Sequence, residues 1–247
     1  MVLLNINLPI PLSNGLNEVP QNVGTMYNEG FELALTANLI RTQNLNWSVT
    51  AQASTFKNKI TDLPSPFVNG SKRWEVGRSR FDFYIYDYAG VDPDNGDALY
   101  NMYEGDVNAG ERVPVLNADG TQATTNDWDE AGRAYVGEQS IPDLIGSIQN
   151  RINYKGLALD FIFTFSQGGK ILDNGYAGLM HTGDYGDAYH PDALNAWRNP
   201  GDITSVPRLE NGNSNQVQTQ STRFLTDASF VALRNVNLSY TFNTDIS

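Results

Sequence analysis

Residues 145–167, IGSIQNRINYKGLALDFIFTFSQ, alternate apolar and polar positions in two arms. In the second arm a large apolar side chain stands at every other position from Leu157 to Phe165, and mostly small or polar residues lie between them. The first arm shows the same alternation before Tyr154-Lys155-Gly156. Because successive side chains of a strand point to opposite faces, the pattern predicts a hairpin that turns at these three residues and has one apolar and one polar face.

The same alternation recurs in other parts of the chain and brings the number of predicted strands to about six. Proline cannot donate a ladder hydrogen bond, so we expect the first strand to end at Pro9. The other predicted strands are Val2 to Leu8, Phe31 to Leu39 after Asn28-Glu29-Gly30, Leu45 to Ala53 after a short turn at residues 41–44, and Val236 to Phe242 within residues 223–242.

Two kinds of protein fit such strands. A soluble β-sandwich buries the apolar face, whereas a membrane β-barrel exposes it to lipid. Here the turns are very short, yet the other ends of the strands run into segments of dozens of residues, which is typical of outer-membrane barrels. We therefore predict an all-β fold, part of an antiparallel transmembrane β-barrel with long extracellular loops. The predicted lipid-facing residues are Phe31, Leu33, Leu35, Trp47, Val49, Leu157, Leu159, Phe161, Phe163, Phe165, Leu238 and Tyr240.

The segments between the strands carry weaker patterns. Residues 56–74 read as irregular, and FDFYIYDYAG predicts a second hairpin that closes on residues 99–103. Its strands either span the membrane or fold within an outer loop, and we favour the loop. Residues 105–141 and 168–222 lack periodicity apart from a helical turn near 192–197. If the turns at 41–44 and 155–156 are periplasmic, then residues 57–73, 105–141 and 168–222 are extracellular and shape the substrate surface.

Composition narrows the class of protein. The chain is 40% hydrophobic and 18% charged, with Gly 22, Tyr 12 and Phe 11, which suits a β-rich protein with many turns rather than a disordered one. The net charge of -12 argues against a nucleic-acid surface. There is no cysteine, hence no disulfide. No run of 18 apolar residues is present, but a barrel strand needs only about 9–11 residues.

Candidate catalytic and metal residues are few. His181 and His190 lie in one loop with Asp184, Asp187 and Asp192, which suggests a metal site, but solvated loop residues are the more common case. Asp92, Asp94 and Asp97 around Gly96 miss the spacing of a calcium loop, so a turn built by Pro93, Asn95 and Gly96 is the better interpretation. No catalytic arrangement is apparent. The sequence therefore predicts no enzyme, no metal and no cofactor.

Aromatic residues gather in or beside the predicted outer loops. Flat rings with polar tips suit the faces of sugars, although packing within the loops or a girdle at the membrane interface is the more common role of any single such residue. The candidates for substrate binding are Tyr84, Tyr86, Tyr88, Tyr100, Tyr103, Trp128, Tyr176, Tyr185, Tyr189 and Trp197.

Five segments, taken in order, resemble the C-terminal part of the SusC/RagA-type TonB-dependent transporters of Bacteroidetes. The segments are NEGFELALTANLI with LNWSVTAQASTFKNKITDL, AGVDPDNGDALY, IPDLIGSIQNRINYKGLALDFIFTFSQGGKI, LNAWRNPGDITSVPRL and STRFLTDASFVALRNVNLSYTF. The resemblance implies a plugged outer-membrane barrel of about 22 strands. It further implies nutrient import driven by TonB-ExbB-ExbD, a SusD-like surface lipoprotein as partner, and a glycan or peptide as cargo.

The start of the chain, MVLLNINLPIPLSNG, has no cationic n-region and no small-residue cleavage site. We therefore expect residues 1–247 to be the C-terminal portion of the barrel, without the plug, the TonB box, the early strands and the last strand or two. Alone, such an open sheet is expected to aggregate through its edges. The alternatives are a surface-exposed β-sandwich that binds carbohydrate without transporting it, and a passive porin.

Overall fold

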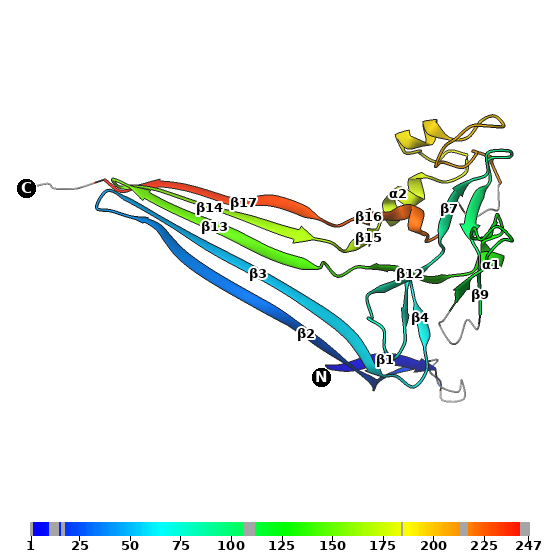
Figure 1. The fold of residues 1–247 in the computed structure, drawn as a ribbon, viewed down its shortest axis with the longest axis horizontal. Helices are drawn as coiled ribbons and strands as arrows, with labels where there is room; N and C mark the ends of the chain where they lie inside the picture. Colours follow the sequence, from blue (N-terminus) through cyan, green and yellow to red (C-terminus); the bar gives the residue numbers. More distant parts are fainter. Residues whose placement is uncertain are drawn as a thin grey trace, which may run out of the picture. The chain divides into compact units, whose positions relative to one another are not determined.

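The computed structural model describes residues 2–9, 15, 18–105, 112–183, 185–212 and 217–242. Its contacts group the chain into two compact units, each described here by itself (Figure 1). The strand unit consists of Tyr27–Asn58, Ser140–Lys170 and Asp227–Ser247. The loop unit consists of Met1–Met26, Lys59–Gln139 and Ile171–Thr226.

One antiparallel sheet contains all the strands predicted from the alternating pattern (Figure 1). Neighbouring strands of this sheet run antiparallel in each pair whose register the structure describes. Five of its strands contribute to the strand unit, and β1 pairs with the first part of β2 inside the loop unit. In sheet order the strands are β1 (Val2–Pro9), β2 (Glu18–Arg41), β3 (Leu45–Asp62), β13 (Leu144–Tyr154), β14 (Leu157–Gln167) and β17 (Phe230–Tyr240).

The hairpin of β13 and β14 is regular from end to end, with Leu144 opposite Gln167 and Tyr154 opposite Leu157. Lys155 and Gly156 form its two-residue turn with φ of 45° and 87°. Positive φ at both central positions is the geometry of a type I′ turn, whose twist matches that of the flanking strands. The predicted turn is confirmed.

The register places the predicted lipid-facing side chains on one face of the sheet. Leu159 of β14 lies opposite Ile152 of β13 and Leu238 of β17, and Ile152 in turn lies opposite Trp47 of β3. On the other face the hydroxyls of Thr36 and Thr50 are 3.0 Å apart, so the alternate residues of β2, from Phe31 to Leu39, share the apolar face.

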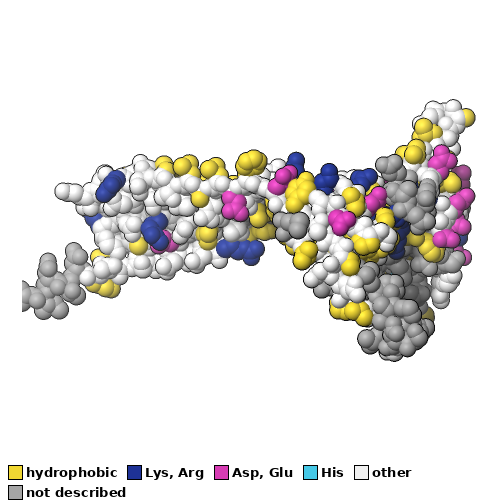
Figure 2. Space-filling view, turned by 90° about the horizontal axis from the view of Figure 1, so that it is seen from below, with side chains coloured by type: hydrophobic (Ala, Val, Ile, Leu, Met, Phe, Trp, Pro, Cys, Tyr) yellow, Lys and Arg dark blue, Asp and Glu magenta, His cyan; other side chains and the backbone are white. Residues whose placement is uncertain are grey.

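No second layer covers this face within the described part of the chain. Phe31 is 84% exposed and Val231 is 76% exposed, and Figure 2 shows hydrophobic side chains on the surface of these strands. A soluble sandwich buries this face, at about 1.5–3 kcal/mol for each large side chain. The exposed face therefore contradicts the sandwich alternative.

A β-bulge in β17 keeps the apolar residues on the same face. Val236 and Leu238 stand at even positions, but Val231 and Leu233 stand at odd ones. The register shifts between Ile162 and Phe163 of β14, which face Asn235 and Leu233, so Arg234 is the extra residue. The apolar residues stand at odd positions before the bulge and at even positions after it. The extra residue thus keeps all of them on one continuous apolar surface.

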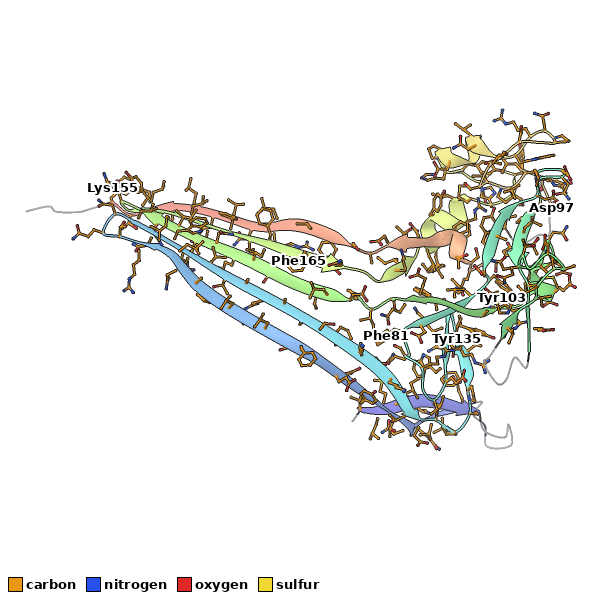
Figure 3. All side chains as sticks on the ribbon, in the orientation of Figure 1. Phe81, Asp97, Tyr103, Tyr135, Lys155 and Phe165 are labelled. Carbon is orange, nitrogen blue, oxygen red and sulfur yellow. The ribbon has the colours of Figure 1, made fainter. Side chains whose placement is uncertain are left out.

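Both short turns lie at the same end of the strand unit, where Lys155 is labelled in Figure 3. The backbone nitrogen of Lys155 donates to the carbonyl of Asn44 at 3.1 Å, and that of Thr241 donates to the carbonyl of Gly156 at 2.8 Å. This arrangement confirms that the long segments all leave from the opposite ends of the strands.

Two of the strands are longer than predicted. β2 begins at Glu18, and β3 continues to Asp62, so the prediction of irregular chain from residue 56 is wrong. Along the end of β3, exposed Lys57, Lys59 and Thr61 alternate with buried Asn58 and Ile60. The pattern was missed because an asparagine occupies an inward position, where its side chain donates to Asn28 at 2.7 Å.

The segments read as aperiodic contain short elements. The predicted hairpin is confirmed as β7 (Tyr88–Val91) with β8 (Ala98–Asn101), whose four-residue strands are too short to cross a bilayer. The helical turn near 192–197 is confirmed as η2 (Pro191–Asn195). Among the described residues, no helix is long and apolar enough to cross a membrane.

The remaining elements of the loop unit form small sheets and single helical turns. One sheet contains β12 (Ala134–Gln139), β6 (Asp82–Ile85), β5 (Lys72–Trp74) and β4 (Phe67–Asn69). The others are β11 (Thr124–Thr125) beside β8 and β7, β10 (Val113–Pro114) with β9 (Tyr103–Glu104), and β15 (Lys170–Leu172) with β16 (Leu225–Asp227). The helices are α1 (Trp128–Ala131), α2 (Asn174–Leu179) and η3 (Thr222–Phe224).

Among the described residues, three apolar clusters hold the loop unit together. One gathers Leu4, Met26, Ile60, Leu63 and Trp74. A second surrounds Tyr86 and Tyr100, and a third surrounds Met180 and Phe224. The predicted extracellular segments 57–73, 105–141 and 168–222 therefore contribute to a packed unit, and the last two contain short strands and helical turns although their sequences lack periodicity.

Gly30 allows β2 and β3 to approach closely, and this gives a testable prediction. A Cβ atom at Gly30 would lie 2.0 Å from the carbonyl oxygen of Thr55, whereas one at Gly178 in α2 meets nothing within 4 Å. We expect Gly30→Ala to lower the free energy of unfolding of the membrane-inserted protein by about 1–3 kcal/mol in a guanidinium titration. Gly178→Ala is the matched control, and equal stability of the two variants would contradict the close approach.

Candidate functional site

The polar face of the strand unit forms a shallow groove of about 900 Å³ that is lined by all five strands. Its lining mixes apolar residues, among them Ala34, Ile145 and Phe230, with hydroxyl, amide and charged side chains. The polar side chains include Glu32, Gln52, Ser54, Ser147, Thr164, Ser166 and Arg234. Such a surface offers many hydrogen-bonding groups to a polar solute.

The charges on this face are spread over its strands. Arg151 of β13 donates from Nε to Asp160 of β14 at 2.6 Å. The bulge residue Arg234 donates from Nε to the hydroxyl of Thr164 at 3.2 Å and lies over the ring of Phe230. The extra residue of the bulge thus brings a cation to the polar face, which the alternation in the sequence did not predict.

Three of the predicted substrate residues are buried in the loop unit. The rings of Tyr86 and Tyr100 are 6.1 Å apart and meet edge to face, and Tyr84 meets Tyr135 in the same way at 5.1 Å. All three are at most 6% exposed. In this structure Tyr84, Tyr86 and Tyr100 pack the unit rather than face a ligand.

Tyr88, Tyr103 and Trp128 are half-buried, and Tyr88 and Trp128 pack against the cluster of Tyr86 and Tyr100. Trp128 opens α1, whose N-cap Asp127 accepts from the backbone of Asp129, and its ring meets Tyr86 at 5.6 Å. The hydroxyl of Tyr103 donates to Asp87 at 2.6 Å. Burial, together with this carboxylate, raises the pKa of Tyr103 to about 12, so its hydroxyl stays a proton donor at neutral pH.

The two histidines are held by their own segment rather than gathered as ligands. His181 is buried, its ring is stacked on Tyr189 at 4.3 Å, and its Nδ1 accepts from the backbone of Gly183 at 3.2 Å. His190 Nδ1 lies 3.3 Å from Asp192. The expectation of a solvated loop is therefore wrong for His181. Among the described residues no group of acidic and histidine side chains could hold a metal ion; Asp184 lies outside them.

Tyr176 and Tyr185 differ sharply in their surroundings. Asp173 caps α2 by accepting from the backbone of Tyr176, whose hydroxyl donates to Asp192 at 2.8 Å. Tyr185, in contrast, is 99% exposed. Of the ten predicted aromatic residues it is the one most accessible to a partner or a solute.

The last candidate, Trp197, belongs to a docking of two distant segments that the sequence did not predict. The turn at residues 92–97 forms as expected, with the backbone of Gly96 donating to the carbonyl of Asp92 at 2.8 Å. Trp197 Nε1 and the backbone of Gly201 both donate to the carbonyl of Pro93, at 3.0 and 2.8 Å. We call this contact the turn clamp, formed by residues 92–97 and 195–208.

Arg208 completes the turn clamp. Its backbone nitrogen donates to the carbonyl of Gly96 at 2.8 Å, and its guanidinium lies 3.2 Å from buried Asp97. The other carboxylate oxygen of Asp97 accepts from Asn126 at 2.9 Å. Asp97 therefore acts as a structural acceptor in a turn, as the spacing of the acidic residues indicated, and both halves of the clamp come from segments quoted for the family resemblance.

Arg223 is a further residue that sequence reasoning missed. Its guanidinium lies over the rings of Tyr88 and Phe224, at 5.6 and 5.0 Å, and donates to the carbonyl of Val217 at 3.1 Å. Burial lowers the pKa of this guanidinium. Arg223 thus links two of the apolar clusters by cation–π contact.

The sheet exposes an apolar face on one side and a groove with hydrogen-bonding groups on the other. Walls of outer-membrane β-barrels have this construction. Comparisons with known proteins agree with this class. The TonB-dependent receptor P39 of Formosa agariphila is 29% identical over 97% of the chain and 26% of its own length. SusC of Bacteroides thetaiotaomicron, a TonB-dependent receptor, is 24% identical over 97% of the chain and 23% of its own length.

A solved structure of the RagAB peptide transporter matches 96% of the chain with a TM-score of 0.79 and 28% identity. These comparisons bear out the resemblance of the chain to the SusC/RagA-type TonB-dependent transporters. It spans about a quarter of the length of the relatives it matches. No protein-family model matches the chain.

The turn clamp predicts a specific effect of Asp97→Asn. Loss of the charge removes the ion pair with Arg208 and weakens the hydrogen bond from Asn126, and a hydrogen bond to a charged group contributes about 1.5–3 kcal/mol. We expect trypsin to cleave after Arg198 and Arg208 about tenfold faster in the membrane-inserted variant, because local opening becomes more frequent. Asp119→Asn, in an exposed turn, is the control. Equal cleavage rates in all three proteins would show that the pair does not hold the clamp.

Proposed function

We propose that the chain forms part of an outer-membrane importer that takes up oligosaccharides by a TonB-dependent mechanism. The observation that carries the proposal is the single-layer sheet with two unlike exposed faces, because such a sheet is stable only between lipid and an aqueous lumen. The family supports import as the activity. In this proposal the apolar face contacts outer-membrane lipid, and the polar groove faces the path of the solute.

The predicted roles of the loop unit belong to the same proposal. It lies outside the cell, beneath a SusD-like surface lipoprotein, and energy reaches the importer from TonB-ExbB-ExbD. Exposed Tyr185 and Tyr189 and half-buried Trp197 contact the cargo, whereas buried Tyr84, Tyr86 and Tyr100 shape the unit that carries them. Transport of this kind needs no bond-making chemistry, so the chain is proposed not to be an enzyme.

A peptide is the second candidate cargo. The similarity to the RagAB peptide transporter favours it, and the many amide and hydroxyl groups of the groove suit a peptide backbone as well as a sugar. The aromatic residues of the loop unit favour the oligosaccharide, because flat rings complement the faces of sugar rings.

Uptake by intact cells tests the proposal. Cells that carry the complete protein, and cells that lack it, are given fluorescent oligosaccharides and fluorescent peptides of matched length. We expect oligosaccharide uptake that depends on the protein and stops when a protonophore removes the proton gradient. Uptake of peptides alone would show that the cargo is a peptide and not an oligosaccharide. Uptake that survives loss of TonB would indicate a passive porin instead.

A further inference from the structure

A small cavity of about 320 Å³ opens beside the turn clamp, and we call it the Trp197 cavity. This volume is at the lower end of the range of small-molecule pockets, so it suits one ring of a larger ligand. Its lining combines apolar side chains with two arginines. The lining residues are Ala193, Ala196, Trp197, Arg198, Arg208 and Leu209.

The indole of Trp197 is fixed before any ligand binds. Its Nε1 donates to the carbonyl of Pro93 at 3.0 Å. On the side of Gly96 the approach is so close that a Cβ atom there would lie 2.4 Å from the indole ring. A ring that is already ordered loses little side-chain entropy when a ligand stacks on it.

The two arginines are also held in place. Arg198 donates from Nη2 to the carbonyl of Leu194 at 3.1 Å. Arg208 donates from Nη1 to the carbonyl of Asn95 at 3.3 Å, and its Nη2 lies 2.8 Å from Glu210. Each guanidinium has five N–H groups, and the bond to Leu194 occupies one of those of Arg198. Arg208 offers fewer to a ligand, because its Nη2 faces Asp97 and Glu210 and its Nε is buried.

The charge around the cavity decides which ligand fits. Arg208 lies between Asp97 and Glu210, 3.2 and 2.8 Å away. Asp202 accepts from the backbone of Arg198 and Asn199, and these bonds hold the pKa of Asp202 below its ordinary value. Three carboxylates thus offset two guanidinium groups, so the cavity has no excess positive charge to attract an anion.

We propose that the Trp197 cavity binds one ring of a neutral oligosaccharide, with the apolar face of the sugar on the indole and its hydroxyls toward Arg198 and Arg208. The proposal rests on the proposed import of oligosaccharides and names the place where the cargo is first held. It explains why the turn clamp holds Trp197 half-buried beside a cavity instead of burying it fully, as Tyr84, Tyr86 and Tyr100 are buried.

Calorimetric titration of the complete membrane-inserted protein tests the site. The probes are neutral tetrasaccharides of glucose, mannose and xylose, the tetrasaccharide of galacturonic acid, and tetra-alanine. We expect at least one neutral tetrasaccharide to bind, and Trp197→Leu to raise its Kd about tenfold. Trp197→Phe keeps an aromatic face and should raise the Kd only about threefold.

A second variant guards against a loss of folding. Arg198→Gln leaves the bond from Trp197 to Pro93 in place, and we expect it to raise the Kd about threefold without changing the melting temperature. Arg41→Gln, at the short turn of the strand unit, is the matched control and should bind like the original protein.

The outcomes separate this site from the proposed function. If a neutral tetrasaccharide binds but its Kd is unchanged in Trp197→Leu and Arg198→Gln, the cavity is not the site and the proposed import stands. Binding of the galacturonic acid probe alone would overturn the charge argument. Binding of tetra-alanine alone would overturn both the site and the proposed cargo.

Discussion

The strand unit depends on one constraint, which is that its strands form a single layer. Their backbone N–H and C=O groups therefore have to pair within that layer, and each of its two faces has to suit its own surroundings. Within the described residues no helix or second sheet covers either side of β13 and β14, so each strand obtains its stabilising contacts from its two neighbours. In hydrocarbon each unpaired backbone group costs several kcal/mol. The sheet therefore tolerates few irregularities in its hydrogen-bonded ladder.

The irregularities that do occur preserve the two faces. The bulge at Arg234 returns the apolar residues of β17 to the face set by β14 and brings a cation to the other side. Gly30 permits a close approach to β3 that a side chain would block. The tight turn at Lys155 and Gly156 keeps the register, because a shift by one residue would exchange the lipid and lumen surfaces.

Sequence patterns predicted what depends on local alternation and missed what depends on distant contacts. The faces of β14 and the turn at Lys155 follow from neighbouring residues, so both were predictable. The end of β3 was not, because Asn58 occupies an inward position and finds its partner in β2. Likewise Arg208 and Asp97 are far apart in sequence, and their pairing follows only from the folded path of the loop unit. Burial of Tyr84 and Tyr100 has the same cause.

Spin-label accessibility tests the central claim most directly, namely that the two faces meet lipid and water. The chain has no cysteine. A cysteine that replaces Phe161 or Asp160 is therefore the single site in these 247 residues to which a nitroxide label can be attached. In the membrane-inserted protein we expect the label at Phe161 to be accessible to oxygen dissolved in lipid, and the label at Asp160 to a water-soluble nickel chelate. The opposite result, or equal access at both positions, would contradict the assigned faces.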